Sequence, residues 1–156
     1  CWSAERVLIQ YETALLSVDI VPFAVELFYQ RALFGIGRHR SYSLGDTDIS
    51  FAVNSLLASG LVSVDAEVSR EGLVADIVGV LETHRGVLGD YFGVIIDHGQ
   101  LRGLPVLVEA AGGPNTLLPY PSSIALLLFR LAVEVDWSAE ESAIAGVCRE
   151  LAIAYA

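Results

Sequence analysis

The longest regular pattern of apolar and polar positions lies between Ser69 and Tyr91. Apolar side chains recur there three and four residues apart and form one stripe of Leu73, Ile77, Val80, Leu81, Leu88 and Tyr91. Residues at this spacing share one face of an α-helix, so the pattern predicts a single long amphipathic helix. The stretch also contains four glycines. Each lowers helix stability by about 1 kcal/mol relative to alanine, so the helix must depend on packing.

Two shorter helices are predicted before this one. Pro22 suits the first turn of a helix that ends near Gly35 or Gly37. Its inner face would carry Phe23, Leu27 and Phe34, with Ala24 and Phe28 beside them. Asp48 or Thr47 can cap the second helix, which would span roughly 49–58. Its inner stripe would carry Phe51, Ala52, Ser55 and Leu56.

Two stretches have the composition of β-strands. Residues 6–20 are rich in β-forming side chains and begin to alternate, which predicts either two short strands or one long bent strand. Residues 93–109 predict a hairpin with its turn at His98–Gln100. Pro105 lacks an N–H, which indicates that its strand lies at a sheet edge or directs position 105 outward.

The remaining stretches are read from polarity, proline content and capping signals. Residues 38–48 are polar and predict a connection, and residues 110–123 contain three of the five prolines and predict a loop. Residues 124–135 predict a buried strand or a buried helix, because periodicity cannot separate the two in so short a run. Ser138 and Glu141 match a capping box at the start of a last helix. The inner face of that helix would carry Ile144, Val147, Leu151 and Ala154.

Composition adds an excess of apolar residues to this outline. The 156 residues fit one domain, 54% of them are hydrophobic and only 18% are charged. Ordinary domains contain about 45–50% apolar residues. The excess predicts a large interior or an exposed apolar face. The chain begins at Cys1 and contains no methionine, so we expect it to be a fragment of a longer protein.

Charge and cysteine content narrow the possible partners and compartments. The net charge of −10 disfavours direct binding of nucleic acid, because an acidic domain repels phosphate. Cys1 and Cys148 have no paired spacing, which fits a reducing compartment and supports neither a disulfide framework nor a zinc site. Arg130 and Glu134 interrupt the longest apolar run, so no transmembrane segment is expected.

The sequence offers no arrangement of residues typical of catalysis. His39, His84 and His98 have no nucleophile motif around them, and we interpret all three as structural. The chain contains no G-x-S-x-G, H-E-x-x-H, C-x-x-C or P-loop pattern. The acidic pairs Asp46/Asp48 and Glu140/Glu141 are interpreted as helix caps and first-turn charges. No catalytic, cofactor-binding or metal-binding residue is therefore predicted.

Four segments in order resemble one known family. They read ELFYQ (26–30), GDYFGVIID (89–97), LRGLPVLV (101–108) and FRLAVEVDW (129–137), and a helix follows the W-x-x-E element of Trp137 and Glu140. Together they resemble the C-terminal dimerisation domain of the MutL homologues, DNA mismatch-repair proteins. The closest similarity is to the eukaryotic homologue of the Mlh type that serves as the common subunit of heterodimers. The resemblance covers nearly the whole chain from about Leu8 onward.

The resemblance implies both a fold and a role. The fold would be α/β (α+β), with a mixed β-sheet packed with helices, and we expect residues 36–92 to contain its helical lobe. The single domain, 1–156, would pair with a second MutL homologue of the endonuclease-bearing type, in the nucleus, and other repair proteins could also bind it. The ATPase region would lie upstream. The nicking motif, D-Q-H-A-x-x-E, would lie in the partner, since the only D-H pair here is Asp97–His98, followed by Gly99.

The resemblance also suggests interface residues and marks two departures. Leu8 and Gln10 fall where the family places subunit contacts, so both are predicted to contact the partner. Residues 110–123 form a longer loop than the family's equivalent. The chain stops at Ala156, where the family continues with a further segment.

Other classes of function stay open at this point. The alternative is a small α/β ligand-binding domain or enzyme, which would need polar groups converging in a pocket. A dimerisation domain without its proper partner can also form a homodimer. The bare apolar side chains Leu117, Leu118 and Tyr120 fit a protein-interaction module, and they equally fit a single core.

Overall fold

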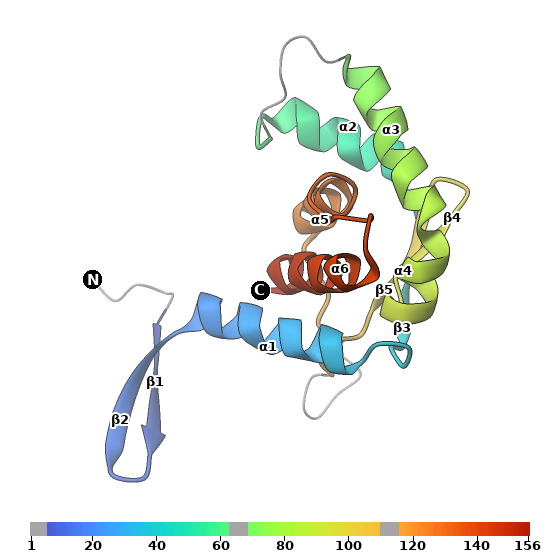
Figure 1. Cartoon of the computed structure of the whole chain (residues 1–156). Helices are drawn as coiled ribbons and strands as arrows, with labels where there is room; N and C mark the ends of the chain where they lie inside the picture. Colours follow the sequence, from blue (N-terminus) through green and yellow to red (C-terminus); the bar gives the residue numbers. More distant parts are fainter. Residues whose placement is uncertain (1–5, 63–68, 110–115) are drawn as a thin grey trace.

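The computed structural model describes residues 6–62, 69–109 and 116–156, which form helices and short strands in the order shown in Figure 1. The elements are β1 (Arg6–Tyr11), β2 (Ala14–Asp19), α1 (Ile20–Phe34), β3 (Ser41–Asp48), α2 (Ile49–Ser59), α3 (Arg70–Thr83), α4 (Arg85–Phe92), β4 (Ile95–Asp97), β5 (Gln100–Pro105), α5 (Pro121–Val133) and α6 (Glu140–Tyr155). The predicted α/β class is confirmed.

Helices α5 and α6 form the centre of the body. The other helices surround this pair, with α1 along α6 and with α2 and α3 against α5 (Figure 1). Leu128, Leu131, Val147 and Leu151 are fully buried in the centre. The stretch that could have been a strand or a helix is therefore the helix α5, which is apolar enough to be covered on several sides.

One ion pair lies within this apolar centre. Arg130 of α5 donates from Nε to Glu150 Oε2 of α6 at 2.5 Å and from Nη2 to Oε1 at 3.3 Å. Glu150 is only 4% exposed. A buried carboxylate is tolerated when a partner satisfies its oxygens, and the forked guanidinium matches both of them.

A sheet of three strands covers one end of the body, in the order β3-β5-β4. Its pairings are antiparallel, as is the pairing of β1 with β2, whereas a mixed sheet would also contain parallel pairs. The hairpin predicted over residues 93–109 is confirmed as β4 and β5. Of the two alternatives inferred from Pro105, the edge strand is wrong, because β5 is the central strand, and the outward-directed position agrees with the structure. Pro105 ends β5 beyond the last residue that pairs with β4, so the sheet tolerates its missing N–H.

The polar connection predicted over residues 38–48 is wrong in part, because residues 41–48 form β3. Most of these side chains are exposed, so no apolar alternation marked the strand in the sequence. Pairing with β5 decides the conformation instead. Within residues 36–92, β3 thus precedes the helices α2, α3 and α4.

The single long helix predicted from Ser69 to Tyr91 is two helices, α3 and α4. They meet at His84, whose φ of −98° and ψ of 8° depart from helical values. The apolar stripe continues through the break, because Ile77, Leu81 and Leu88 are all buried. The spacing of apolar residues shows which face is buried, but it does not show where one helix ends and the next begins in a new direction.

Helix faces were predicted less well than helix positions. Phe23, Phe34 and Phe51 were assigned to inner faces, but they are 56%, 71% and 74% exposed. In α1 the buried residues are Phe28 and Ala32, which lie one turn apart on the face that packs on α6. The predicted stripe was rotated away from that face, because aromatic residues occur on both sides of the helix.

Capping was predicted correctly for α2 and incorrectly for α6. Asp48 accepts a hydrogen bond from the backbone N–H of Phe51, as expected of an N-cap. The expected Ser138–Glu141 capping box is absent. The N-cap of α6 is Ala139, and the hydroxyl of Ser138 donates to Asp136 Oδ1 at 2.6 Å. Because its hydroxyl is bonded to Asp136, Ser138 does not cap the helix.

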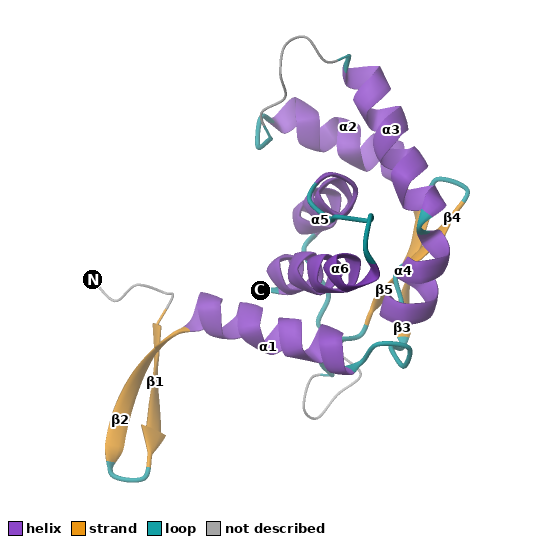
Figure 2. Cartoon of the chain, in the orientation of Figure 1, coloured by secondary structure: helices purple, strands orange, loops and turns teal. Residues whose placement is uncertain are grey.

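Strands β1 and β2 form a separate hairpin that projects from the body beyond the start of α1 (Figure 2). The structure therefore selects two short strands over one bent strand for residues 6–20. We call this hairpin, residues 6–19, the arm. The predicted loop at 110–123 is described only from Thr116 onward, and α5 begins within it at Pro121.

Candidate partner interface

The pairing of β1 with β2 gives the arm two chemically different faces. The strands pair in an unbroken register from Arg6↔Asp19 to Tyr11↔Ala14. Because paired residues share a face and successive residues alternate, the register sorts the side chains into two sets. The first set, the apolar face, consists of Val7, Ile9, Tyr11, Ala14, Leu16 and Val18. The second set, the mixed face, consists of Arg6, Leu8, Gln10, Leu15, Ser17 and Asp19.

Both faces of the arm are open to solvent. On the apolar face, Ile9 is 43% exposed, Leu16 46% and Tyr11 64%. On the mixed face, Leu8 and Leu15 are exposed by half or more. A two-stranded hairpin is at best marginally stable alone in water, so an arm of this composition needs a covering surface.

The first turn of α1 continues the exposed apolar surface. Ile20, Val21 and Phe23 are all at least 40% exposed. They directly follow β2, whose last residue, Asp19, is the N-cap of the helix. The arm and the first turn of α1 therefore form one continuous apolar segment of chain outside the body.

Leu8 and Gln10, the predicted partner contacts, both lie on the mixed face of β1. The Gln10 side chain donates from Nε2 to the carbonyl of Glu12 at 3.4 Å, and otherwise it faces solvent. Ile9, Tyr11 and Leu16 are equally exposed and were not predicted. Their signal was present as an apolar alternation, but it could be read only once the register of the hairpin was known.

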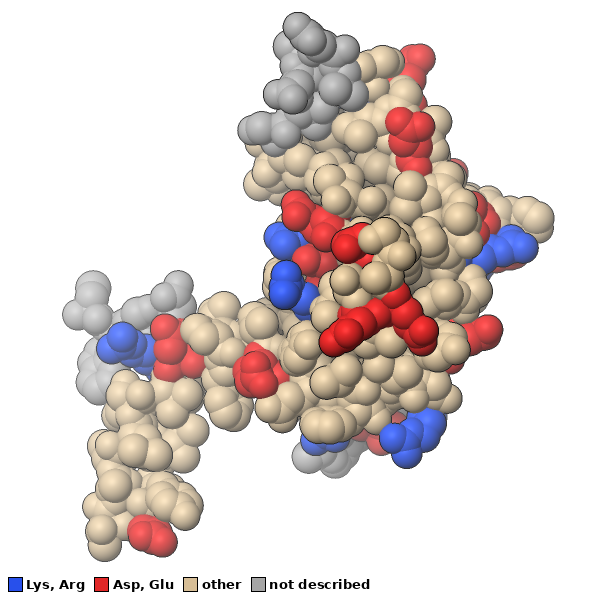
Figure 3. Space-filling view, viewed as in Figure 1, with Lys and Arg blue, Asp and Glu red and all other residues tan. Residues whose placement is uncertain are grey.

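Few charges interrupt the arm surface. Between Arg6 and Asp19 at its base, the only charged residue is Glu12 in the turn. The space-filling view shows carboxylates gathered on the body, while the arm between its base and its tip is almost free of charged side chains (Figure 3). The net charge of −10 is therefore carried mainly elsewhere on the molecule.

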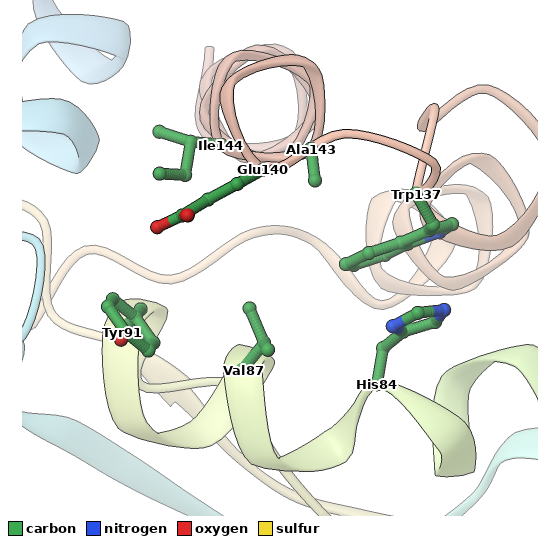
Figure 4. Close-up of a pocket in the computed structure, with 7 residues that line it drawn as sticks. All are labelled: His84, Val87, Tyr91, Trp137, Glu140, Ala143 and Ile144. Atoms are coloured by element: carbon green, nitrogen blue, oxygen red, sulfur yellow. The ribbon is translucent and has the colours of Figure 1, made fainter.

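A pocket of about 400 Å³ lies between α4 and α6 on the body (Figure 4). The ring of His84 stacks on Trp137, with centroids 4.0 Å apart and planes 10° apart. Trp137 is held in place because its Nε1 donates to the Leu131 carbonyl at 3.0 Å. Glu140 supplies the carboxylate of the pocket, beside Tyr91. Apolar walls with one carboxylate suit an apolar ligand that carries a positive charge.

The other two histidines lie apart from this pocket. His39 contacts the Ala32 carbonyl through Nε2 at 2.9 Å, near the end of α1. His98 is exposed in the β4–β5 turn, 3.6 Å from Asp97. Within the described ranges, no group of three His, Cys, Asp or Glu side chains could hold a metal ion. The three histidines thus have different neighbours: His39 contacts α1, His98 lies beside Asp97, and His84 stacks on Trp137.

Burial governs the shifted pKa values inside the body. It raises the pKa of the Cys148 thiol to about 11, which keeps the thiol protonated and unreactive at neutral pH. Burial also raises the pKa of Tyr155, whose hydroxyl donates to the Pro105 carbonyl at 2.5 Å. On the surface, hydrogen bonds from the Ser138 side chain and backbone lower the pKa of Asp136.

Comparison with known proteins settles the family. The family described as "DNA mismatch repair protein Mlh1 C-terminus" matches residues 2–156. The chain belongs to this family. The match confirms the resemblance to MutL homologues of the Mlh type. In the part of the chain that the structure describes, no helix of this Mlh1 C-terminal domain is long and apolar enough to span a membrane.

Two curated relatives of the chain are named as DNA mismatch repair proteins. The DNA mismatch repair protein MLH1 of Saccharomyces cerevisiae is 24% identical over 156 residues, which cover 94% of this chain and 19% of the relative. The DNA mismatch repair protein Mlh1 of Dictyostelium discoideum is 25% identical over 160 residues, with 97% and 17% covered. The chain thus spans less than a fifth of the length of either relative.

Proposed function

We propose that this chain is the non-catalytic dimerisation module of a MutL homologue in DNA mismatch repair. Its partner would be a second MutL homologue of the endonuclease-bearing type. The observation that carries the proposal is the arm, whose apolar face is exposed although it has the composition of a core. The relatives are named as DNA mismatch repair proteins, which supports a role for this chain in mismatch repair.

The exposure and chemistry of this segment support pairing with another folded chain. Soluble monomers rarely expose continuous apolar surfaces larger than a few hundred Å². Permanent interfaces bury about 2,000 Å² or more and resemble a core divided between two chains. Both faces of the arm, together with Ile20, Val21 and Phe23, offer such a half-core.

The remaining roles follow from membership of the family. The full-length protein would act in the nucleus, with its ATPase region outside this chain and its nicking site in the partner. This domain would need no cofactor and would contact neither nucleic acid nor membrane directly. Other repair proteins would bind the body, where the pocket between α4 and α6 is a candidate surface.

Analytical sedimentation tests the pairing directly. The chain is run alone and mixed with the C-terminal domain of a MutL homologue of the post-meiotic-segregation type. We expect a one-to-one complex in the mixture, and self-association of the chain alone at high concentration. A chain that stays monomeric in both samples contradicts the proposal.

A pair of matched variants locates the contact. Phe23→Asp places a charge beside the arm, and Phe51→Asp places the same charge on an exposed phenylalanine of α2. We expect Phe23→Asp to abolish the complex and Phe51→Asp to leave it intact. Equal losses from both variants would mean that the arm is not the specific contact.

The non-catalytic assignment has its own assay. Supercoiled DNA is incubated with manganese and either the chain or the complex. We expect nicking only when the partner domain is present, and robust nicking by the chain alone would overturn the assignment.

A further inference from the structure

The arm has an open sheet edge along β1. In the described part of the chain, β1 pairs with β2 and with no other strand. Helix α1 continues directly from the end of β2, and the main contact of β1 is β2 itself. Within the described residues the outer edge of β1 is therefore unpaired.

The turn of the arm identifies which pairs use their backbone groups internally. Glu12 and Thr13 form a two-residue loop, and Glu12 has a φ of 52°. A turn of this length joins its flanking residues, Tyr11 and Ala14, by a backbone hydrogen bond. Antiparallel pairs alternate along a ladder between hydrogen-bonded and non-hydrogen-bonded pairs.

This alternation identifies the residues of β1 whose backbone groups face the open edge. Counting back from the turn, the non-hydrogen-bonded pairs are Gln10↔Leu15, Leu8↔Ser17 and, at the base, Arg6↔Asp19. The N–H and C=O groups of Leu8 and Gln10 therefore point away from β2, toward the open edge. The family resemblance implies partner contacts for the same two residues.

The edge of β1 lacks the features that normally prevent strand pairing. Sheet edges are usually protected by charged side chains, proline or bulges. The edge strand β3 has such protection, with Asp46, Asp48 and an irregular register between Ser43 and Thr47. By contrast, β1 has no proline, no bulge and no charge after Arg6. The edge at β3 is blocked, whereas the edge at β1 is left able to pair.

We infer that a strand of a second MutL-type dimerisation domain pairs with the open edge of β1, so that the sheet continues across the interface. This inference rests on the proposed function. Such strand addition takes its affinity from main-chain hydrogen bonds and its specificity from alternate side chains. The added strand would be largely uncharged, because the stretch that it covers, Val7–Tyr11, carries no charge.

Two proline variants separate the two edges of the arm. In Gln10→Pro the lost N–H faces the open edge of β1, and in Ser17→Pro it faces the outer edge of β2. Neither change removes a main-chain hydrogen bond inside the arm. Gln10→Pro also removes the 3.4 Å bond from the Gln10 side chain to the Glu12 carbonyl, which lies at the turn. Binding to the partner domain of the sedimentation experiment is then measured. We expect Gln10→Pro to weaken binding about tenfold or more, and Ser17→Pro to change it by less than about threefold.

Amide hydrogen exchange of the unmutated chain tests the same point without relying on the folding of a variant. The amides of Leu8 and Gln10 should exchange freely in the monomer and become protected when the partner domain is added. Protection of both in the isolated monomer would mean that the chain covers its own edge, which overturns the inference.

The outcomes keep the inference and the proposed function apart. If the unmutated chain does not bind the partner domain, the proposed function fails. If it binds, but the two amides stay unprotected and Gln10→Pro binds normally, strand addition at β1 is wrong and the function stands. A loss confined to Ser17→Pro would likewise overturn the inference, because pairing would then occur at β2.

Discussion

Helices α5 and α6 and the arm contain equally apolar side chains in opposite surroundings. Leu128 and Leu151 are completely covered by the helices around them, whereas Leu8 and Leu15 are exposed by half or more. The body buries its leucines against its own chain, and the buried carboxylate of Glu150 is paired with Arg130. The arm buries few of its apolar side chains. Apolar content alone therefore does not distinguish a core from an interface. What distinguishes them is whether the surface that covers the side chains belongs to the same chain or to another.

The largest expected effect comes from a cavity in the body. Leu128→Ala removes a fully buried side chain of α5 and should lower the free energy of unfolding by about 4 kcal/mol. Urea denaturation monitored by circular dichroism measures the loss. A loss below about 1 kcal/mol would show that the centre is loosely packed, and the contrast with the arm would disappear.

Breaking the buried ion pair should have the next largest effect. Arg130→Met leaves the Glu150 carboxylate buried without its partner and should cost about 3 kcal/mol. The matched control is the double variant Arg130→Met/Glu150→Met, which removes both charges and should recover most of the loss. If the double variant is as unstable as the single one, packing rather than charge explains the effect.

Removing the N-cap of α2 should have a smaller effect. Asp48→Ala deletes the carboxylate that accepts from the Phe51 N–H and should cost about 1 kcal/mol. Thermal unfolding by calorimetry would detect it. Asp48→Asn keeps an acceptor at this position and should retain most of the stability, and a full loss there would argue for charge instead of capping.

The smallest effect should come from the arm. Leu15→Ser on the isolated chain should change the free energy of unfolding by less than about 0.5 kcal/mol, because Leu15 is 66% exposed. The same urea titration used for Leu128→Ala provides the comparison. A loss of about 1.5 kcal/mol or more would mean that the arm already packs in the free chain.

The sequence predicted element positions well where local chemistry decides them. The hairpin over residues 93–109 and the cap at Asp48 were predicted because a turn signal and a capping aspartate act over a few residues. The predictions that failed required distant contacts. Strand β3 exists because β5 pairs with it, and the break at His84 coincides with the stacking of that ring on Trp137.

The candidate interface was predicted in part, for a similar reason. Leu8 and Gln10 came from the family resemblance. Ile9, Tyr11 and Leu16 needed the register of the hairpin, which fixes the face of every side chain. The faces of α1 depend on its packing against α6, more than a hundred positions later in the sequence, so exposed Phe23 and buried Phe28 could not be separated.

The packing of α1 on α6 has a consequence for synthesis of the chain. The two helices that cover each other are the first and the last of the described body, and Tyr155 of α6 also bonds the end of β5. Ribosomes release α1 long before α6, so Phe28 and Ala32 have no partner surface during most of translation. Contacts between distant segments form late and slow folding. The body should therefore fold only after α6 has emerged, and nascent chains arrested before residue 140 should remain protease-sensitive.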